Sequence, residues 1–550
     1  MKSIINSIPY LSENFQPFGC KEISNDIYKK LSLQPSFPYF TIENQWIAKV
    51  HTKKDKHYLL SVSTFLEVTQ KIIDIDTKEI SLRIALYNGN KQTERIFSSD
   101  ILSTQGIKEL LKYGVRYEEK MRDNLIKYLM ISEQNAPVKK VYSRLGWHNH
   151  GDELRFKGAF LHTKNGVLKN YAYGGNLSLL PKGDFEAWTA MVNSELVKPN
   201  NIPLQFVLAL GFSSSILSLM NDEFELGSVI FSISGYSSKG KTTSAILATS
   251  AFSCPIMDEG TLISYYSTSN GLIKTLESCD SLTVAIDEAA ANPSKGSTDH
   301  LLYAMAAGAS KRRMEGSLKL QDMQRFSSVI ISTAEFNLLN EHPPDGLRAR
   351  VYEINEQMTT SAESSNRIKN VALNNYGHAG VYYLEHLVKH SRSAIKKKYI
   401  KAINKLVSIS EHSDLSYRMA TKLAVVVTTV EYFNAAFKGI MQLDYEKILY
   451  FAADIINRNA NKKTPEEKLL NIVFEDYAVN GYKYAKSAKD WTDGCIGIVK
   501  SNMSYTYICV LRSYFEKLME SNSITNSDVV LRALKKQGLL DSYSDHLCKK

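Results

Sequence analysis

Residues 235–242 read GYSSKGKT and match the pattern GxxxxGK(S/T), with an apolar run at 229–233 before them and a helical run at 243–251 after them. Glycines let backbone N–H groups turn toward a phosphate, and the start of the following helix adds positive potential. Lys241 can reach the β- and γ-phosphates, and the Thr242 hydroxyl can bind Mg²⁺. The segment therefore predicts ATP binding with Mg²⁺. The residues assigned to ATP are Gly235, Ser238, Lys239, Gly240, Lys241, Thr242 and Thr243.

Two adjacent acids, Asp287 and Glu288, end the apolar run 282–286. Many buried strands end in an acid, so the run by itself indicates little. Downstream of a phosphate loop it predicts that Asp287 binds Mg²⁺ together with Thr242 and that Glu288 polarises the attacking water.

Three further polar groups border the apolar runs that follow. Thr333 ends the run 328–332, where its hydroxyl either orients the water or caps a turn. Arg348 and Arg350 precede the run 351–354. We favour Arg350, with Arg348 in reserve, as the arginine that reaches the nucleotide of a neighbouring copy. A surface arginine without a role is the alternative.

Basic residues cluster in three places that are candidates for contact with DNA phosphates. In each, a solvated surface is the alternative. The first cluster flanks a Glu-Gly-Ser turn and contains Lys311, Arg312, Arg313 and Lys319. The second is the stretch 381–410. The third is the terminal helix 527–540, which resembles the recognition helix of a winged-helix unit, a unit that reads DNA or docks proteins.

The elements that must position these residues follow from the hydrophobic pattern. Short apolar runs separated by helix-length segments indicate an α/β fold with a parallel five-stranded sheet. The five runs are 228–234, 254–257, 282–286, 328–332 and 351–354. An alternating run at 80–86, a turn at 88–90 and a helical piece at 106–130 indicate an α+β domain before the sheet. The predicted domains are 1–195 (α+β accessory), 196–365 (ATPase core), 366–462 (helical lid) and 463–550 (winged helix).

The composition is that of an ordinary globular protein. Of 550 residues, 44% are apolar and 23% charged, which excludes a disordered or collagen-like chain. The formal net charge of +10 permits a polyanionic partner without requiring one. The six cysteines form no CxxC pair, so a disulfide framework is not expected. Polar residues interrupt the most apolar stretch, 202–220, which indicates a buried helix, and we expect a cytoplasmic protein without a membrane span.

The order of these motifs resembles that of AAA+ ATPases. The chain also resembles the Cch family of staphylococcal cassette chromosome elements and related phage and island replication proteins. The residues that carry this second resemblance are Leu145-Gly146-Trp147, Tyr303 with Gly308 and Lys311, the runs 332–335 and 376–380, and the stretch 515–540. One departure is that no clear asparagine stands at the end of the third strand, where Thr333 and Glu335 are available. Arg418 is a candidate second sensor in the lid.

The resemblance implies an MCM-like, self-loading hexameric DNA helicase, with single-stranded DNA in a central channel and a winged helix after the motor. We therefore expect an ATP-dependent helicase or translocase that acts as a homo-hexamer on forked duplex during replication of a mobile genetic element. Two other classes stay open. One is a nucleotide-switched DNA-binding regulator without processive unwinding, and the other is a DNA-packaging or remodelling ATPase.

Overall fold

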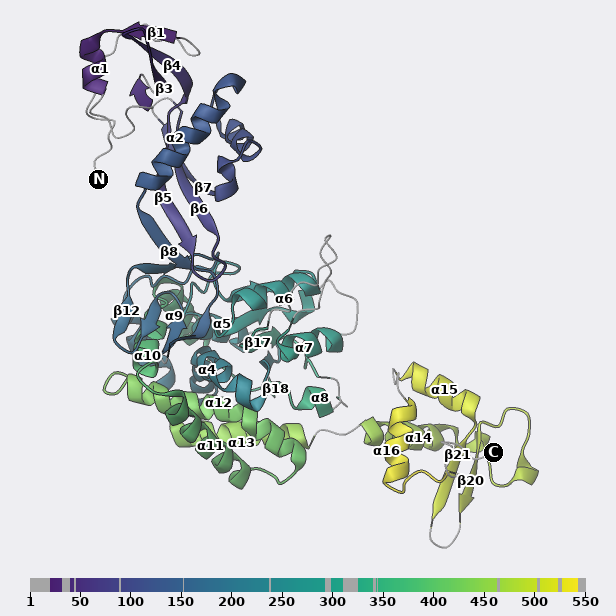
Figure 1. Ribbon diagram of the computed structural model, residues 1–550. Helices are drawn as coiled ribbons and strands as arrows, with labels where there is room; N and C mark the ends of the chain where they lie inside the picture. The colour runs from purple at the N-terminus through teal and green to yellow at the C-terminus, as the bar shows by residue number, and fades with distance from the viewer. Residues whose placement is uncertain are drawn as a thin grey trace. The chain divides into compact units, whose positions relative to one another are not determined.

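The computed structural model in Figure 1 describes residues 20–31, 40–43, 46–88, 91–151, 153–236, 239–291, 298–309, 325–339, 343, 345–461, 465–501, 505–522 and 527–542. The chain divides into two compact units. The first comprises residues 1–145 with 155–176, and the second comprises residues 146–154 with 177–550.

Two sheets lie wholly within the first unit, with the strand orders β1-β4-β3-β2 and β13-β8-β5-β6-β7. Their elements are β1 (Cys20–Ile23), α1 (Asn25–Leu31), β2 (Phe40–Glu43), β3 (Trp46–Lys53), β4 (Lys56–Thr64), β5 (Leu66–Asp74), β6 (Ile80–Asn88), β7 (Lys91–Ser98), α2 (Arg122–Asn135), β8 (Val138–Tyr142) and β13 (Tyr171–Tyr173). The unit also contains β11 (Leu161–Thr163) and β12 (Gly166–Leu168) of a third sheet. This unit mixes strands and helices, in line with the α+β pattern of the sequence.

The hairpin of β6 and β7 forms where the alternating pattern predicts it, with Asn88 opposite Lys91. Its apolar side chains, such as Ile84, pack on Leu125 and Leu129 of α2. The expected helical piece 106–130 is broken in two. A 3₁₀ helix over Gly106–Tyr113 stops at Gly114, whose φ of 91° is left-handed, and α2 starts only at Arg122. A glycine adopts that conformation readily and ends the helix there.

The second unit contains a five-stranded parallel sheet with the order β15-β16-β17-β14-β18. Its strands are β14 (Val229–Ser234), β15 (Leu262–Ser264), β16 (Val284–Asp287), β17 (Val329–Ala334) and β18 (Val351–Ile354). Every residue of β14 and β17 is buried, as in parallel sheets covered on both faces. This order inserts β17 between β14 and β16. The ends of three strands that carry candidate site residues thus meet at one sheet edge.

The prediction of a strand at 254–257 is wrong, because the second strand of the sheet is Leu262–Ser264. Pro255 has no backbone N–H to give to a ladder. The N–H of Cys254 is bonded to the carbonyl of Ser178 at 2.8 Å, which leads this segment away from the sheet.

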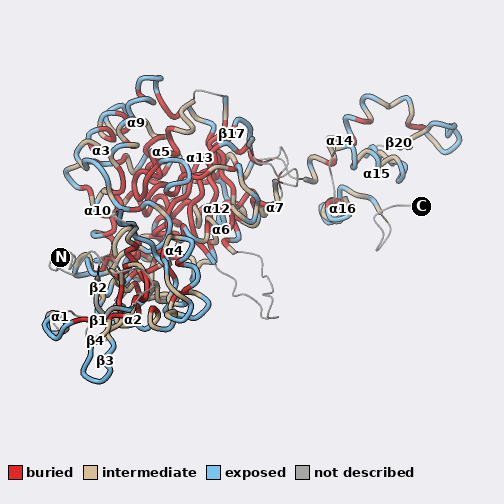
Figure 2. Tube along the Cα trace, turned by 90° about the horizontal axis from the view of Figure 1, so that it is seen from above, coloured by how far each residue is buried: buried red, intermediate tan, exposed pale blue. Residues whose placement is uncertain are grey.

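Helices cover the sheet and form a bundle beyond it. In Figure 1, α11, α12 and α13 lie side by side. The helices are α3 (Phe185–Val192), α4 (Ile202–Phe224), α5 (Lys241–Thr249), α6 (Ser269–Ser278), α7 (Thr298–Ala307), α8 (Asp345–Arg348), α9 (Ala362–Asn374), α10 (His378–Leu387), α11 (Arg392–Ile409), α12 (Asp414–Ala436) and α13 (Tyr445–Ala460). Buried residues concentrate around α5, α12 and α13 (Figure 2).

Among the described residues, α4 is the helix with the length and apolarity to cross a membrane. The Asn201 side chain caps it by accepting the Leu204 N–H at 3.2 Å. Its residues from Leu204 to Leu217 are all buried, and the helix packs on α5 and α12. It is therefore a core helix of this unit, as the polar interruptions in its sequence predict.

The C-terminal segment has a small core of its own. Its elements are α14 (Pro465–Asn480), β19 (Tyr484–Ala485), β20 (Gly497–Ser501), β21 (Thr506–Val510), α15 (Arg512–Ser521) and α16 (Ser527–Lys536). Val473 of α14, Met519 of α15 and Leu534 of α16 pack together. The hairpin β20–β21 precedes the last two helices. Arg532 and Lys536 are exposed on one face of α16.

Candidate nucleotide-binding site

The loop between β14 and α5 depends on two glycines. Gly235 has a φ of 134° and Gly240 a φ of 83°, values that only glycine adopts easily. A Cβ on Gly240 would lie 2.7 Å from the Thr359 hydroxyl. The loop thus folds tightly against the segment after β18, and its last residues start α5, as the sequence motif predicts. Ser238, assigned to ATP from the sequence, lies outside the described residues.

The two lysines of the loop have different surroundings. The Lys241 Nζ donates to the carbonyls of Gly235 at 2.6 Å and Tyr236 at 3.0 Å, so the ammonium lies inside the loop. The Lys239 Nζ donates to the Asn355 carbonyl at 3.2 Å. Lys239 therefore ties the loop to the chain after β18, and unlike Lys241 it does not line the cavity described below.

Thr333 links the two acids that follow β16. Its hydroxyl donates to the Asp287 carboxylate and accepts the Glu288 backbone N–H at 3.0 Å. Glu288 has a φ of 60°, a left-handed conformation that is costly for a residue with a side chain. The Thr242 hydroxyl lies 3.3 Å from both Asp287 carboxylate oxygens. Thr333 thus holds Asp287 at the loop and keeps Glu288, whose side chain is exposed, in its strained conformation.

These residues face one cavity of about 820 Å³, within the usual range for ligand sites. The sequence-predicted residues that line it are Gly240, Lys241, Thr242, Thr243, Asp287, Glu288 and Thr333, whereas Gly235 does not. The far wall is α9, which the sequence reasoning missed. It contributes Ser365, Asn366 and Lys369, which are three and four residues apart on one helix face. Polar residues at this helical spacing, in the first helix after the last strand of the sheet, are the sequence signal that could have identified this wall.

α9 is fastened to its surroundings by polar contacts. The Ser365 and Thr243 hydroxyls are 2.6 Å apart, which joins α9 to α5. Glu195 accepts hydrogen bonds from Arg367 at 2.7 Å and from Ser364 at 2.5 Å. The Arg367 bond lowers the pKa of Glu195. These hydrogen bonds, to Thr243 of α5 and to Glu195, hold α9 in place as one wall of the cavity.

The donor set fits ATP with Mg²⁺. A hydroxyl and a carboxylate, from Thr242 and Asp287, are hard oxygen ligands of the kind Mg²⁺ prefers. The Lys241 ammonium and the N–H groups at the start of α5 suit a triphosphate. No residue of the set is chemically unsuited to either.

The two candidate arginines before β18 have different roles. Arg348 is buried and donates to the Asn459 carbonyl at 3.0 and 3.1 Å, to the Ala460 carbonyl and to Asp345. The N–H donors of Arg348 are thus used within the fold. Arg348 is therefore no longer a second candidate for the arginine that reaches the nucleotide of a neighbouring copy. Arg350 is half-buried, bonds the Gly346 carbonyl at 2.7 Å and lies over the Tyr303 ring.

Arg350 lies at the amino-terminal ends of the strands, whereas the phosphate loop lies at their carboxyl-terminal ends. Val351 pairs with Ile230 near the start of β14, whereas the loop follows the end of β14 at Ser234. A strand of this length separates the two edges by about 15–20 Å. Arg350 therefore cannot reach a nucleotide in the cavity of its own copy. Arg418, the candidate second sensor, is also absent from that cavity.

Two other sequence-based expectations concern loops. The DNA candidates Lys311, Arg312, Arg313 and Lys319 lie outside the described residues. An asparagine, Asn337, does follow β17, three residues beyond its end. Its Oδ1 lies 2.8 Å from the Ser234 hydroxyl at the base of the phosphate loop. Its distance from the strand end is the reason that the sequence did not single it out.

A family model described as a domain of unknown function, DUF927, matches residues 40–322, more than half of the chain. The chain belongs to the DUF927 family. In this DUF927 member a second model, described as the Cch helix turn helix domain, matches residues 466–550. No curated protein matches the sequence.

The fold of this DUF927 member is shared with a solved structure titled "SCCmec type IV Cch - active helicase". The two align with a TM-score of 0.73 and 22% sequence identity, over 92% of this chain and 95% of the other. At this identity the similarity shows the fold. Together with the helix-turn-helix match, it confirms the resemblance to Cch that the sequence motifs indicate.

Proposed function

We propose that the chain is an ATP-dependent DNA helicase with an AAA+ core. The observation that carries the proposal is the convergence of Lys241, Thr242, Asp287, Glu288 and Thr333 on one cavity at the carboxyl edge of the parallel sheet. An ammonium, a hydroxyl and two acids in this arrangement are what phosphoryl transfer to water requires.

Each residue has a part in the proposed reaction. Lys241 binds phosphate oxygens, and Thr242 with Asp287 holds Mg²⁺. When bound, Mg²⁺ supplies positive charge to the phosphate oxygens. Glu288 orients the water and accepts its proton, and Thr333 positions both acids through its hydroxyl. In this proposal Thr333 is thus a positioning residue.

We extend the proposal to DNA and to a ring. The helix-turn-helix match and the exposed cations of α16 support DNA as the substrate. The placement of Arg350 at the far sheet edge supports a homo-hexamer in which it meets the nucleotide of the next copy. The shared fold of a protein titled as an active helicase of SCCmec supports a role in replication of a mobile genetic element, in the cytoplasm.

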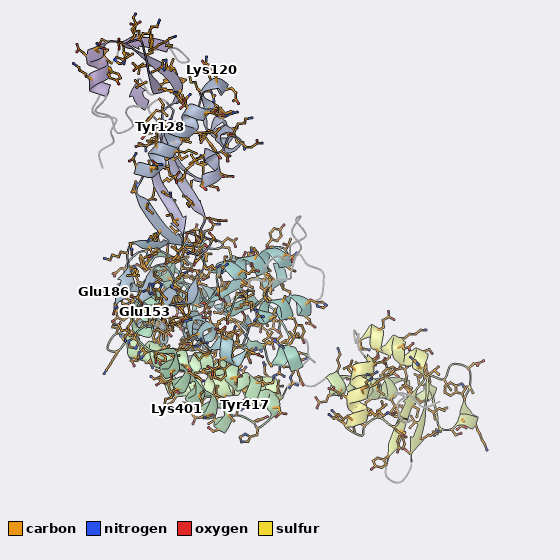
Figure 3. The ribbon with its side chains drawn as sticks, in the orientation of Figure 1. Lys120, Tyr128, Glu153, Glu186, Lys401 and Tyr417 are labelled. Atoms are coloured by element: carbon orange, nitrogen blue, oxygen red, sulfur yellow. The ribbon has the colours of Figure 1, made fainter. Side chains whose placement is uncertain are left out.

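The test is strand displacement on a forked DNA duplex with ATP, repeated with a non-hydrolysable analogue. Lys241→Ala and Glu288→Gln should each abolish displacement, and Glu288→Gln should retain nucleotide binding. Glu186→Gln on α3 is the matched control, because Glu186 is exposed and away from the cavity (Figure 3). Unwinding by Glu288→Gln at the wild-type rate would refute the assignment.

The same assay separates the other classes. A nucleotide-switched regulator would bind DNA in a nucleotide-dependent way without displacing a strand. A packaging or remodelling ATPase would hydrolyse ATP and leave the fork intact.

A further inference from the structure

A second cavity, of about 870 Å³, opens at the amino edge of the parallel sheet, where Ala349 and Arg350 precede β18. It shares no lining residue with the nucleotide cavity. Its charged and titratable lining residues are Arg325, Arg350, Arg392, Arg418 and Lys422, with Asp222, Glu225, Asp280 and His148. Five cations against three acids make it a basic cavity.

Three of the cations converge. Arg418 and Lys422 are one turn apart on the same side of α12, and they line the cavity together with Arg350. The pKa of Lys422 is lowered to about 7. Burial is the largest cause, and the positive charges of Arg350 and Arg418 add to it. Lys422 and both arginines are therefore close enough to repel one another.

The acids of the cavity do not neutralise this group. Asp222 pairs with Arg392 at 3.5 Å, and Asp280 accepts the Ser327 N–H at 2.8 Å. Within the described part of the chain, no carboxylate forms an ion pair with Arg350, Arg418 or Lys422. Like charges held together without a counter-ion cost stability, and a bound anion would offset that cost.

We propose that Arg350, Arg418 and Lys422 form one phosphate-binding site, occupied by the terminal phosphate of ATP held by the neighbouring copy, and that Lys422 takes up a proton from solvent when the phosphate binds. The inference rests on the proposed function and adds a regulatory residue to it. Arg418 is exposed and Lys422 is half-buried. Because arginine stays protonated in proteins, Lys422 is the member whose charge can depend on occupancy.

The proton linkage has a definite sign. Without the anion, Lys422 is largely neutral above about pH 7, and binding must then supply the missing proton. The contribution of Lys422 to phosphate engagement therefore weakens as pH rises above about 7, by up to about tenfold per pH unit, and levels off below it. Lys422→Arg stays charged and should remove this dependence. The substitution leaves His148, Asp280 and every other lining group in place. The difference in pH dependence between the wild-type and Lys422→Arg proteins therefore reports on Lys422 alone.

The first experiment measures proton uptake on binding of a non-hydrolysable ATP analogue to the full-length Glu288→Gln protein. Calorimetry at pH 8 in two buffers of different ionisation enthalpy gives the number of protons. We expect uptake in this background, none after Lys422→Arg or Lys422→Met, and unchanged uptake after Lys401→Met. Lys401 is an exposed lysine of α11 outside the cavity (Figure 3). Equal uptake in the Lys422→Arg protein would overturn the inference.

A mixing experiment tests whether the phosphate comes from a neighbour. Lys241→Ala removes the nucleotide of a copy, and Lys422→Met removes the receiving site, so each variant alone should lose at least about tenfold in ATPase rate. A mixture contains interfaces with an intact half from each variant, and its rate should exceed that of either one. No gain on mixing would overturn the neighbour as the source.

DNA is the other source of phosphate, and binding of a labelled single strand without nucleotide distinguishes it. Unchanged DNA affinity in Lys422→Met supports the inference, and a loss confined to DNA affinity overturns it. A wild-type protein without ATPase activity would instead refute the proposed function. Failure of the inference alone leaves wild-type hydrolysis intact.

Discussion

Thr333→Val is the substitution that most directly probes how the acids are held. Valine has nearly the volume of threonine, so it opens no cavity at this buried position. It removes the hydroxyl that donates to Asp287 and accepts the Glu288 N–H. An unsatisfied buried N–H costs about 1–3 kcal/mol, and a lost hydrogen bond to a charged group costs about 1.5–3 kcal/mol.

The two losses share one hydroxyl, and Asp287 keeps the Thr242 hydroxyl as a second donor. We therefore expect the second unit to lose about 2–4 kcal/mol of unfolding free energy. Released from Thr333, Glu288 leaves its left-handed conformation, and the misplaced carboxylate should lower the ATPase kcat by about ten- to a hundredfold.

The assay combines scanning calorimetry with steady-state ATPase measurements, and Thr333→Ser is the control. Serine keeps the hydroxyl and loses one methyl group, so it should cost about 1 kcal/mol and retain most of kcat. If Thr333→Val matched Thr333→Ser in both stability and kcat, the hydroxyl would not hold the acids and the reasoning would be wrong.

Three further outcomes follow from the same structure. Gly240→Ala should reduce binding of a fluorescent ATP analogue, because the φ of 83° disfavours a side chain and its Cβ would lie 2.7 Å from a threonine hydroxyl; unchanged affinity would contradict this. Arg348→Met should destabilise the second unit by about 2–4 kcal/mol in calorimetry, since the carbonyl of Asn459 loses its charged donor. Glu195→Gln should lower the thermal midpoint at pH 7. Because Arg367 lowers the Glu195 pKa in the folded state, this difference should be full above about pH 5, shrink as pH falls below the unfolded pKa of about 4.3, and vanish once folded Glu195 is protonated as well.

The phosphate loop could be predicted because its chemistry is local. Gly235, Gly240 and Lys241 lie within seven consecutive residues, and the backbone conformation that binds phosphate is encoded in that stretch. Asp287 and Glu288 could be identified because they end an apolar run downstream of that loop. A parallel sheet brings the carboxyl ends of its strands together, so acids at such an end are expected near the loop. The parallel sheet itself followed from buried apolar runs.

Contacts between distant segments could not be predicted in the same way. Thr333 was left between two interpretations because the sequence does not give the strand order that places β17 beside β16. Pro255 was overlooked within an otherwise apolar run. Lys422 is 72 residues from Arg350 (422 − 350 = 72), and no periodicity connects them. Only the folded chain brings α12 and the residue before β18 to one cavity, where their charges meet.

The anchoring of Arg348 has a mechanical consequence. Its guanidinium grips the carbonyls of Asn459 and Ala460 in the last turn of α13, and the Asn459 amide donates in return to the carbonyls of Arg348 and Val351. The chain continues from this turn toward the C-terminal helix-turn-helix segment. These reciprocal hydrogen bonds join the end of α13 to the start of β18, so a displacement of one is expected to move the other. In the proposed helicase, this coupling would connect the C-terminal segment to the residues just before β18, where Arg350 lies.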